Sequence, residues 1–218
     1  MASTNDQRTI WLARHGMRQD FEQEGWCETA DRPHDPPLSD NGRTQAGETG
    51  RFLKDKGLDR IYTSPFLRTV ETSAIIAAHC NAPVFIEHGL GEVQKAEWFP
   101  RAPDFISPDV LKKRFPHIDT SYRSRVMPAF PESEEDGELD ARCRQTVAGL
   151  LEDGWRCTLW VGHGASVGGM ARGLTGDVEG VSFQMCGLTG WTGAPGNWRQ
   201  IYGGTEHLSI TEETLRFH

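Results

Sequence analysis

An apolar run that ends in a cluster of basic residues constrains this chain more than any other stretch. The apolar residues 9–13 predict a buried strand, and Arg14, His15 and Gly16 follow it at once, with Arg18 two residues further on. The strand therefore carries the cluster to its C-terminal end, which is where open α/β sheets bind ligands. Because guanidinium groups match phosphate oxygens in bidentate geometry, the cluster suits a site for a phosphoryl group.

The histidine in this cluster has the chemistry of a nucleophile. A neutral imidazole nitrogen can attack phosphorus when an acceptor holds the proton of the other ring nitrogen. Gly16 lets the backbone turn tightly after His15, while Arg14 and Arg18 could hold the non-bridging oxygens. Taken alone, the motif favours a structural histidine at the end of a strand over a nucleophile.

A second apolar run, over 157–162, ends in His163 and Gly164. His163 stands between this predicted strand and a predicted helix over 165–174, and the N-terminus of a helix favours anions. Two histidines at strand ends predict one shared site at the same edge of a sheet. A buried histidine bonded to the backbone is the alternative for His163.

Two further charged residues follow predicted strands. Ser64 and Pro65 open a predicted helix over 66–79, and Arg68 in its first turn adds a third guanidinium at the same edge. Glu92 follows a short predicted strand over 83–86, and a carboxylic acid beside bound phosphate would have the raised pKa that protonation of a leaving alkoxide requires. Considered separately, Arg68 could form a surface salt bridge and Glu92 resembles any surface glutamate.

Strands and helices alternate along the rest of the chain. Further helices are predicted over 39–56, with Ser39 as N-cap, and over 135–153; further strands over 60–63, 186–192 and 198–202, the last two as a hairpin. This order predicts a three-layer α/β/α sandwich with a mainly parallel sheet and an antiparallel edge.

Two segments depart from this alternation of strands and helices, and the spacing of apolar residues in the helix over 66–79 predicts which of its side chains are buried. Residues 20–37 are predicted to be a loop, and residues from about 93 to 134 a cap-like insertion with one short helix over 110–115, within a single domain spanning 1–218. The helix over 66–79 is predicted to bury one stripe: Leu67, Val70, Ala74, Ile75 and Ala78.

Composition and charge narrow the class of protein. The net charge of −8 argues against a general binder of nucleic acid or acidic membranes and makes the local arginine cluster more informative. The five cysteines are scattered and lack a C-x-x-C pair, which indicates a reducing, intracellular environment. Residues 1–8 contain no apolar leader region, and no apolar stretch reaches membrane-spanning length. We therefore expect a cytoplasmic protein with no nucleic-acid or membrane partner.

These motifs, in this order and over nearly the whole chain, resemble the histidine phosphatase superfamily, the phosphoglycerate mutase-like fold. The resemblance rests on three motifs: Arg14-His15-Gly16, Ser64-Pro65 with Arg68, and Gly162-His163-Gly164. Within the superfamily, residues 14–18, 35–39, 89–92 and 118–123 are similar to the phosphatase domain of the suppressor of T-cell receptor signalling (TULA) proteins and to ecdysteroid-phosphate phosphatase.

The resemblance implies a metal-independent phosphomonoester hydrolase that forms a phosphohistidine on His15. It implies that Glu92 protonates the leaving group and then activates water, and that no metal or organic cofactor is needed. The side chains implied in catalysis are His15, Glu92, His163, Arg14 and Arg68. Those implied in phosphate binding are Arg14, Arg18, Arg68 and His163. The implied substrate is a small-molecule or phosphotyrosine-type phosphomonoester, and a homodimer is compatible with the family.

The chain departs from the family pattern around two of these motifs. Mutases carry Glu and then Ser or Thr after the glycine, where this chain has Met17 and Arg18, which disfavours a mutase. TULA-like proteins carry aromatic residues on both sides of the acid, where this chain has Gly91 and Val93, with Trp98 six residues after Glu92. The aromatic residues of the insertion nonetheless predict a flat or aromatic leaving group, such as phosphotyrosine or a steroid phosphate.

Three alternatives remain open at this point. A phosphoglycerate mutase-type phosphotransferase and a non-catalytic phosphate-ligand binding protein would use the same scaffold. In the third, residues 164–168 match the G-x-S-x-G nucleophile elbow of α/β-hydrolases, with Ser166 as nucleophile and Asp177 and His207 in the required order. The eight histidines show no H-x-H or H-E-x-x-H spacing, so no metal site is predicted.

Overall fold

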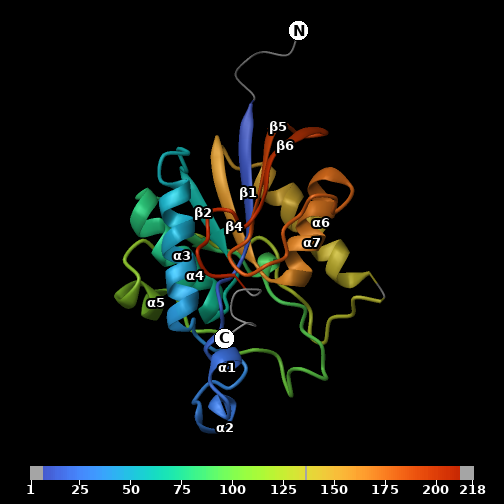
Figure 1. Cartoon of the computed structure of the whole chain (residues 1–218). Helices are drawn as coiled ribbons and strands as arrows, with labels where there is room; N and C mark the ends of the chain where they lie inside the picture. The colour runs from blue at the N-terminus through green and yellow to red at the C-terminus, as the bar shows by residue number, and fades with distance from the viewer. Residues whose placement is uncertain (1–6, 136, 212–218) are drawn as a thin grey trace.

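The computed structural model describes residues 7–135 and 137–211, and a mixed sheet runs through the centre of this part (Figure 1). Its strands are β1 (Arg8–Arg14), β2 (Arg60–Thr63), β3 (Val84–Ile86), β4 (Cys157–Gly162), β5 (Leu188–Ala194) and β6 (Asn197–Gly204). They are ordered β3-β2-β4-β1-β5-β6. The first four in this order are mutually parallel, whereas β5 is antiparallel to both β1 and β6. The mainly parallel sheet with an antiparallel edge is therefore confirmed.

Helices cover both faces of the sheet (Figure 1). One face carries α3 (Asp40–Leu53), α4 (Leu67–Cys80) and α5 (Pro108–Arg114), and the other carries α6 (Glu138–Leu151) and α7 (Gly164–Thr175). Side chains alternate along a strand, so Trp11 and Ala13 of β1 enter the core beneath α3 and α4. Ile10 and Leu12 enter the second core, beneath α6 and α7. The predicted α/β/α sandwich is confirmed.

The loop after β1 packs tightly against the start of α3. Ser39 is the N-cap, as predicted, and its hydroxyl accepts a hydrogen bond from Gly42 N at 3.1 Å. A Cβ on Gly16 would lie 2.7 Å from the Gly42 carbonyl oxygen, and one on Gly42 would lie 2.1 Å from the Met17 carbonyl oxygen. Only glycine allows this approach, which fixes the backbone that follows His15 against α3.

The segment 20–37 is not wholly a loop, contrary to the prediction. It contains two short helices, α1 (Gln19–Glu22) and α2 (Trp26–Thr29), below the C-terminal end of β1 in Figure 1. A bridge between Arg18 and Leu38 closes the excursion at its base. Helices this short form no regular apolar stripe, so periodicity could not reveal them.

The stripe predicted for α4 is wrong in its second half. Ala78 is exposed and Ile75 is only half-buried, whereas Ile76 and Ala77 are completely buried. The helix lies between α3 and the sheet, so most of its circumference is covered and a single stripe underestimates what it buries. The helix predicted from residue 135 begins at Glu138, and Asp136 lies outside the described residues.

Residues 93–134 are mostly irregular and contain one helix, α5, close to its predicted position. The buried Glu87 carboxylate, just after β3, fastens this segment to the sheet. It accepts hydrogen bonds from Tyr122 Oη at 2.7 Å, Ser124 Oγ at 2.6 Å and Arg125 N at 2.9 Å.

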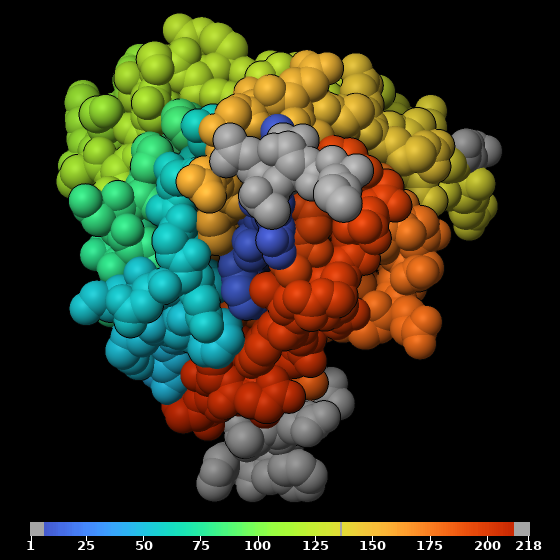
Figure 2. Space-filling model, turned by 90° about the horizontal axis from the view of Figure 1, so that it is seen from above, coloured from blue at the N-terminus to red at the C-terminus, as the bar shows by residue number. Residues whose placement is uncertain are grey.

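Figure 2 views the end of the molecule opposite the C-terminal ends of the parallel strands, where the start of β1 is packed between its neighbours. Within the described ranges, no helix is long and apolar enough to cross a membrane.

Candidate active site

His15 lies at the end of β1 with only 1% of its surface exposed. Its Nδ1 is 2.7 Å from the Gly16 carbonyl oxygen. A carbonyl can only accept, so Nδ1 carries the proton and Nε2 keeps a free lone pair. Burial, together with the charges of Arg68 and Arg14, holds the pKa of His15 well below its ordinary value of 6.5. The ring is therefore neutral at physiological pH, with one nitrogen able to act as a nucleophile.

His163, at the end of β4, faces His15 with 5.3 Å between the ring centroids. The Nδ1 of His163 is 3.1 Å from Arg68 Nη2, and its Nε2 is 2.8 Å from Ser64 Oγ. Guanidinium can only donate, so Nδ1 accepts and Nε2–H donates to Ser64. Burial and the charge of Arg68 also hold the pKa of His163 well below 6.5.

Arg68, in the first turn of α4, is 98% buried and lies over the Phe66 ring, 4.5 Å from its centroid. Burial lowers its pKa to about 10, so it stays charged at neutral pH. Among the described residues its Nε and Nη1 have no hydrogen-bond partner. Two buried, charged donors without acceptors are costly unless an anion accepts from them.

The other two arginines lie at the same edge but are engaged differently. Arg14 donates from Nη1 to the Phe183 carbonyl at 2.9 Å. Its Nε lies close to Gly164 at the start of α7, since a Cβ placed on that glycine would be 3.9 Å from it. Arg18 donates to both carboxylate oxygens of Asp20, at 2.9 Å and 2.5 Å. The charge of Arg18 is therefore partly offset by Asp20, which no motif in the sequence singles out.

Glu92 completes the cluster, just after the 3₁₀ turn η1 (His88–Leu90). Its Oε2 is 3.5 Å from His163 Nδ1 and 3.9 Å from Arg68 Nη2. Burial raises the pKa of Glu92, although Arg68 opposes the shift. A cavity of about 380 Å³ is lined here by Arg18, Asp20, Cys27, Pro33, His34, Arg68, Glu92, Trp98 and Phe99.

The structure therefore brings together all six predicted site residues, from four different segments of the chain. They are Arg14, His15, Arg18, Arg68, Glu92 and His163.

Several residues that support the site are not evident from the sequence. In the sequence Ser64 is evident only as a helix opener, yet its hydroxyl orients the His163 ring. Asp35 Oδ1 accepts from Leu67 N at 2.7 Å and ties the 20–37 excursion to the start of α4. Thr72 accepts from Gly16 N at 3.1 Å. Ser64 and Asp35 lie inside sequence motifs that point to the site, whereas no local sequence feature points to Thr72.

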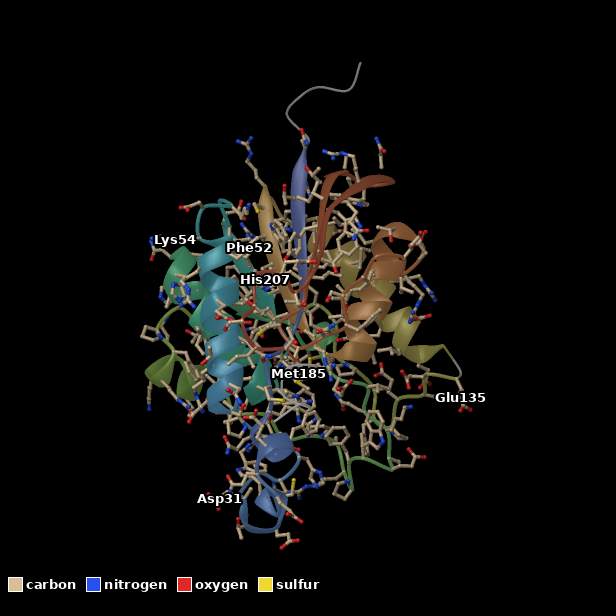
Figure 3. All side chains as sticks on the ribbon, viewed as in Figure 1. Asp31, Phe52, Lys54, Glu135, Met185 and His207 are labelled. Atoms are coloured by element: carbon tan, nitrogen blue, oxygen red, sulfur yellow. The ribbon has the colours of Figure 1, made fainter. Side chains whose placement is uncertain are left out.

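Ser166 is not placed as a hydrolase nucleophile. It is fully buried, and its Oγ accepts from His163 N at 2.9 Å and donates to the Leu90 carbonyl at 3.0 Å. His207 belongs to another cluster, with its ring 5.1 Å from that of Phe52 and Nδ1 2.9 Å from Tyr202 Oη (Figure 3). The elbow motif thus supplies a hydroxyl that joins His163 to the loop before Glu92.

The two buried histidines predict that the fold loses stability in acid. Their pKa values are lower in the native than in the unfolded chain, so below about pH 6.5 only the unfolded chain takes up these protons. The free energy of unfolding should then fall with falling pH, by about 1.4 kcal/mol per pH unit for each histidine. The raised pKa values of Glu92 and Asp35 act in the opposite direction, because those groups favour the fold when protonated.

Urea unfolding of wild type and His15→Asn between pH 7.5 and 5 isolates the histidine contribution. The stability of wild type should fall more steeply by about 1.4 kcal/mol per pH unit below pH 6. Parallel profiles for the two proteins would contradict a lowered pKa of His15.

The fold and the site define a class: α/β proteins in which paired histidines and several arginines meet in a buried pocket at the C-terminal ends of parallel strands. The family model described as Histidine phosphatase superfamily (branch 1) matches residues 10–198. The chain belongs to this family.

Similar proteins differ in their described activities. The 55 kDa subunit of transcription factor tau from Saccharomyces cerevisiae is 28% identical over 178 residues, which cover 77% of this chain and 41% of that protein. A probable phosphoglycerate mutase GpmB from Erwinia tasmaniensis is 27% identical over 144 residues, or 65% of each. The chain thus spans less than two thirds of the length of either relative.

Solved structures share the fold at lower identity. The ecdysone phosphate phosphatase of Bombyx mori, in complex with tungstate, superimposes with a TM-score of 0.75 at 20% identity, over 89% of this chain and 92% of that one. A phosphoserine phosphatase mutant from Entamoeba histolytica, in complex with phosphoserine, has a TM-score of 0.62 at 20% identity, over 92% and 99%. These likenesses confirm the phosphoglycerate mutase-like fold.

Proposed function

We propose that this protein hydrolyses phosphomonoesters without a metal ion, through a phosphohistidine on His15. The observation that carries the proposal is the placement of a neutral His15 beside Arg68, whose Nε and Nη1 are buried without acceptors in the described structure. A phosphoryl group bound there would satisfy those donors and lie next to the free Nε2. Membership of the histidine phosphatase superfamily supports the same chemistry.

In the first step, His15 Nε2 attacks phosphorus in line with the ester oxygen. The N–P bond forms as the P–O bond breaks, and the Glu92 carboxyl gives its proton to the departing alkoxide. The raised pKa of Glu92 keeps a population of the protonated acid available for this transfer. Arg68, Arg14 and Arg18 stabilise the negative charge on the equatorial oxygens. His163 accepts from Arg68 Nη2 and so orients that guanidinium toward the phosphoryl group.

In the second step, water attacks phosphorus and the N–P bond breaks. The Glu92 carboxylate takes a proton from the attacking water, and inorganic phosphate leaves with His15 neutral again. The acid of the first step is thus the base of the second.

We propose further that residues 93–134 form a cap that selects a flat or aromatic leaving group. A second cavity, of about 230 Å³, is lined in part by Phe66, Phe99 and Phe105 and shares His34 and Phe99 with the cavity at Glu92. Phe66 also packs edge-on against His163, at 5.1 Å between centroids. An aromatic ring beside the phosphoryl group would gain stacking contacts there.

The similarity to an ecdysone phosphate phosphatase supports such a leaving group. We propose that this chain is related to the TULA and ecdysteroid-phosphate phosphatase group, on the motifs given above. Turnover on phosphotyrosine, phosphoserine and a sugar phosphate tests the preference. A clear preference for the sugar phosphate would contradict it. The cytoplasmic location and the homodimer remain predictions.

The reaction itself is tested by phosphate release from p-nitrophenyl phosphate in the presence of EDTA. We expect turnover, and rapid quenching should trap a phosphoenzyme that is stable to alkali and labile to acid, as a phosphoramidate is. Turnover only on addition of a divalent metal would contradict the proposal. Binding of vanadate without turnover would favour a non-catalytic binder, and phosphoryl transfer to a phosphoglycerate would favour a mutase.

The role of Glu92 predicts a dependence on the leaving group. For Glu92→Gln we expect kcat/KM on an alkyl phosphate such as phosphoserine to fall by about 10²–10³, because the alkoxide must be protonated as it leaves. On p-nitrophenyl phosphate the loss should be below about tenfold, since nitrophenolate leaves unprotonated. Glu97→Gln, an exposed glutamate of the same segment, is the control. Equal losses on the two esters would exclude Glu92 as the acid.

A further inference from the structure

A buried ion pair lies behind the loop that carries Glu92. Arg142 of α6 and Glu132, near the end of the 93–134 segment, are 6% and 4% exposed. Their contact is bidentate, with Arg142 Nε 2.5 Å from Oε1 and Nη2 2.8 Å from Oε2 of Glu132. Burying such a pair costs desolvation energy that its mutual attraction often fails to offset. A gain in stability is therefore a weak explanation for this buried pair. The remaining donor, Nη1 of Arg142, makes contacts that point to another role.

That remaining donor holds the backbone just before Glu92. Arg142 Nη1 donates to the carbonyl of Gly89 at 2.7 Å and to that of Gly91 at 3.1 Å. The carbonyl between them, on Leu90, accepts from Ser166 Oγ. Three consecutive carbonyls are thus held by side chains of α6 and α7, and Glu92 is the next residue.

The Glu92 carboxyl group is weakly held by its own contacts. Its Oε1 accepts a hydrogen bond from the adjacent Val93 N at 3.1 Å. Its approaches to His163 and Arg68, at 3.5 Å and 3.9 Å, are longer than good hydrogen bonds. The position of the carboxyl group therefore follows that of the loop backbone. A general acid must lie within about 3.2 Å of the oxygen it protonates, so small shifts of this loop matter.

The same ion pair closes the base of the proposed cap. Glu132 N donates to the Gln94 carbonyl at 3.0 Å, which joins the end of the segment to its beginning two residues after Glu92. The Glu132 carboxylate also orients the guanidinium, so that Nη1 points at the carbonyls of the loop. The backbone on both sides of Glu92 is therefore tied to this one pair.

We propose that Arg142 and Glu132 are positioning residues, which hold Glu92 at the distance needed to protonate the leaving oxygen. This inference rests on the proposed function, in which Glu92 is the acid. According to this proposal, an ion pair that does not line the cavity at Glu92 selectively affects the hydrolysis of esters whose leaving group needs a proton. A purely structural role would not discriminate between esters.

The test is the double variant Glu132→Leu, Arg142→Met, which removes both charges and keeps the volume. Its kcat/KM on phosphoserine should fall by about 10–100-fold, since a misplacement near 1 Å costs up to about 10². On p-nitrophenyl phosphate kcat/KM should fall less than about threefold, because nitrophenolate leaves without a proton and does not need Glu92 in place. Arg142→Lys, which keeps the charge but not the fork, should show a smaller loss with the same selectivity.

The matched control is Asp140→Leu, Arg172→Met, which removes another bidentate arginine–carboxylate pair linking α6 to α7, at 2.6–3.2 Å. It should leave the ratio of kcat/KM on the two esters unchanged. If the buried double variant fails to fold, Glu132→Gln serves in its place, because it keeps one acceptor for Arg142.

An unchanged ratio, or equal losses on both esters, in a folded variant overturns the proposal. A wild-type protein that hydrolyses neither ester overturns the proposed function instead. The two failures are therefore distinguishable.

Discussion

Replacing His15 by alanine is expected to abolish hydrolysis of p-nitrophenyl phosphate, with kcat/KM falling by a factor of about 10⁴ or more. In the variant, no other neutral ring of the described residues is so placed: His163 Nε2 donates to Ser64 and its Nδ1 accepts from Arg68, so both of its nitrogens are engaged. Vanadate should still bind, because the arginine donors remain. The phosphoenzyme trapped by quenching should disappear with the activity.

Two controls accompany His15→Ala. His117→Ala removes a half-buried histidine from the segment after α5 and should leave the activity within about twofold of wild type. Ser166→Ala removes the hydroxyl of the elbow motif and should largely spare the activity on p-nitrophenyl phosphate, whose leaving group needs no proton from Glu92, whereas a serine hydrolase would lose it. Equal activity of His15→Ala and wild type would refute the phosphohistidine.

Replacing Arg68 by methionine is expected to lower kcat/KM by a factor of about 10³, within the range seen when a charged group that stabilises a transition state is removed. Methionine keeps most of the buried volume but supplies no donor. Because the fork geometry matters, Arg68→Lys should recover only part of the loss. Vanadate affinity should fall as well, which separates this variant from His15→Ala.

The pH profile gives Arg68 a second signature. Its charge lowers the pKa of His15 and of Glu92. Without that charge both pKa values rise, so protonation of His15 should begin to cut kcat/KM at a higher pH than in wild type. The alkaline limb governed by Glu92 should also move upward. An exposed arginine of α3, changed in Arg51→Met, should move neither limb.

Much of the site could be predicted from the sequence because the parallel strands end at one edge of the sheet. An apolar run followed by charged residues reveals the end of a strand, and four such ends supplied His15, Arg68, Glu92 and His163. The residues that the sequence did not reveal act over longer separations. Ser64 bonds to His163 across 99 residues, and Arg142 bonds to Gly89 across 53.

The helix faces were predicted less well for a related reason. Periodicity describes a helix with one covered side, which fits α6 but not α4. Ile76 and Ala77 are buried in the core that the sheet shares with α3 and α4, and nothing local to residues 67–80 encodes how far that core extends around α4. Likewise, a serine in a G-x-S-x-G pattern carries no local sign that its hydroxyl bonds to Leu90, 76 residues away.

The joining of His15 to the sheet has a consequence for local unfolding. His15 N donates to the Gly162 carbonyl and Ser64 N to the Val161 carbonyl, so the amides beside the reacting groups belong to the central ladder. They should exchange with deuterium only through global opening, whereas amides of the 20–37 excursion and of much of 93–134 should exchange through small local fluctuations. The backbone that carries His15 and Ser64, at the base of the pocket, therefore belongs to a different cooperative unit from the segments 20–37 and 93–134 around it. Sequence changes in residues 20–37 and 93–134 could therefore alter which alcohol group the pocket accepts, while the backbone around His15 keeps its geometry.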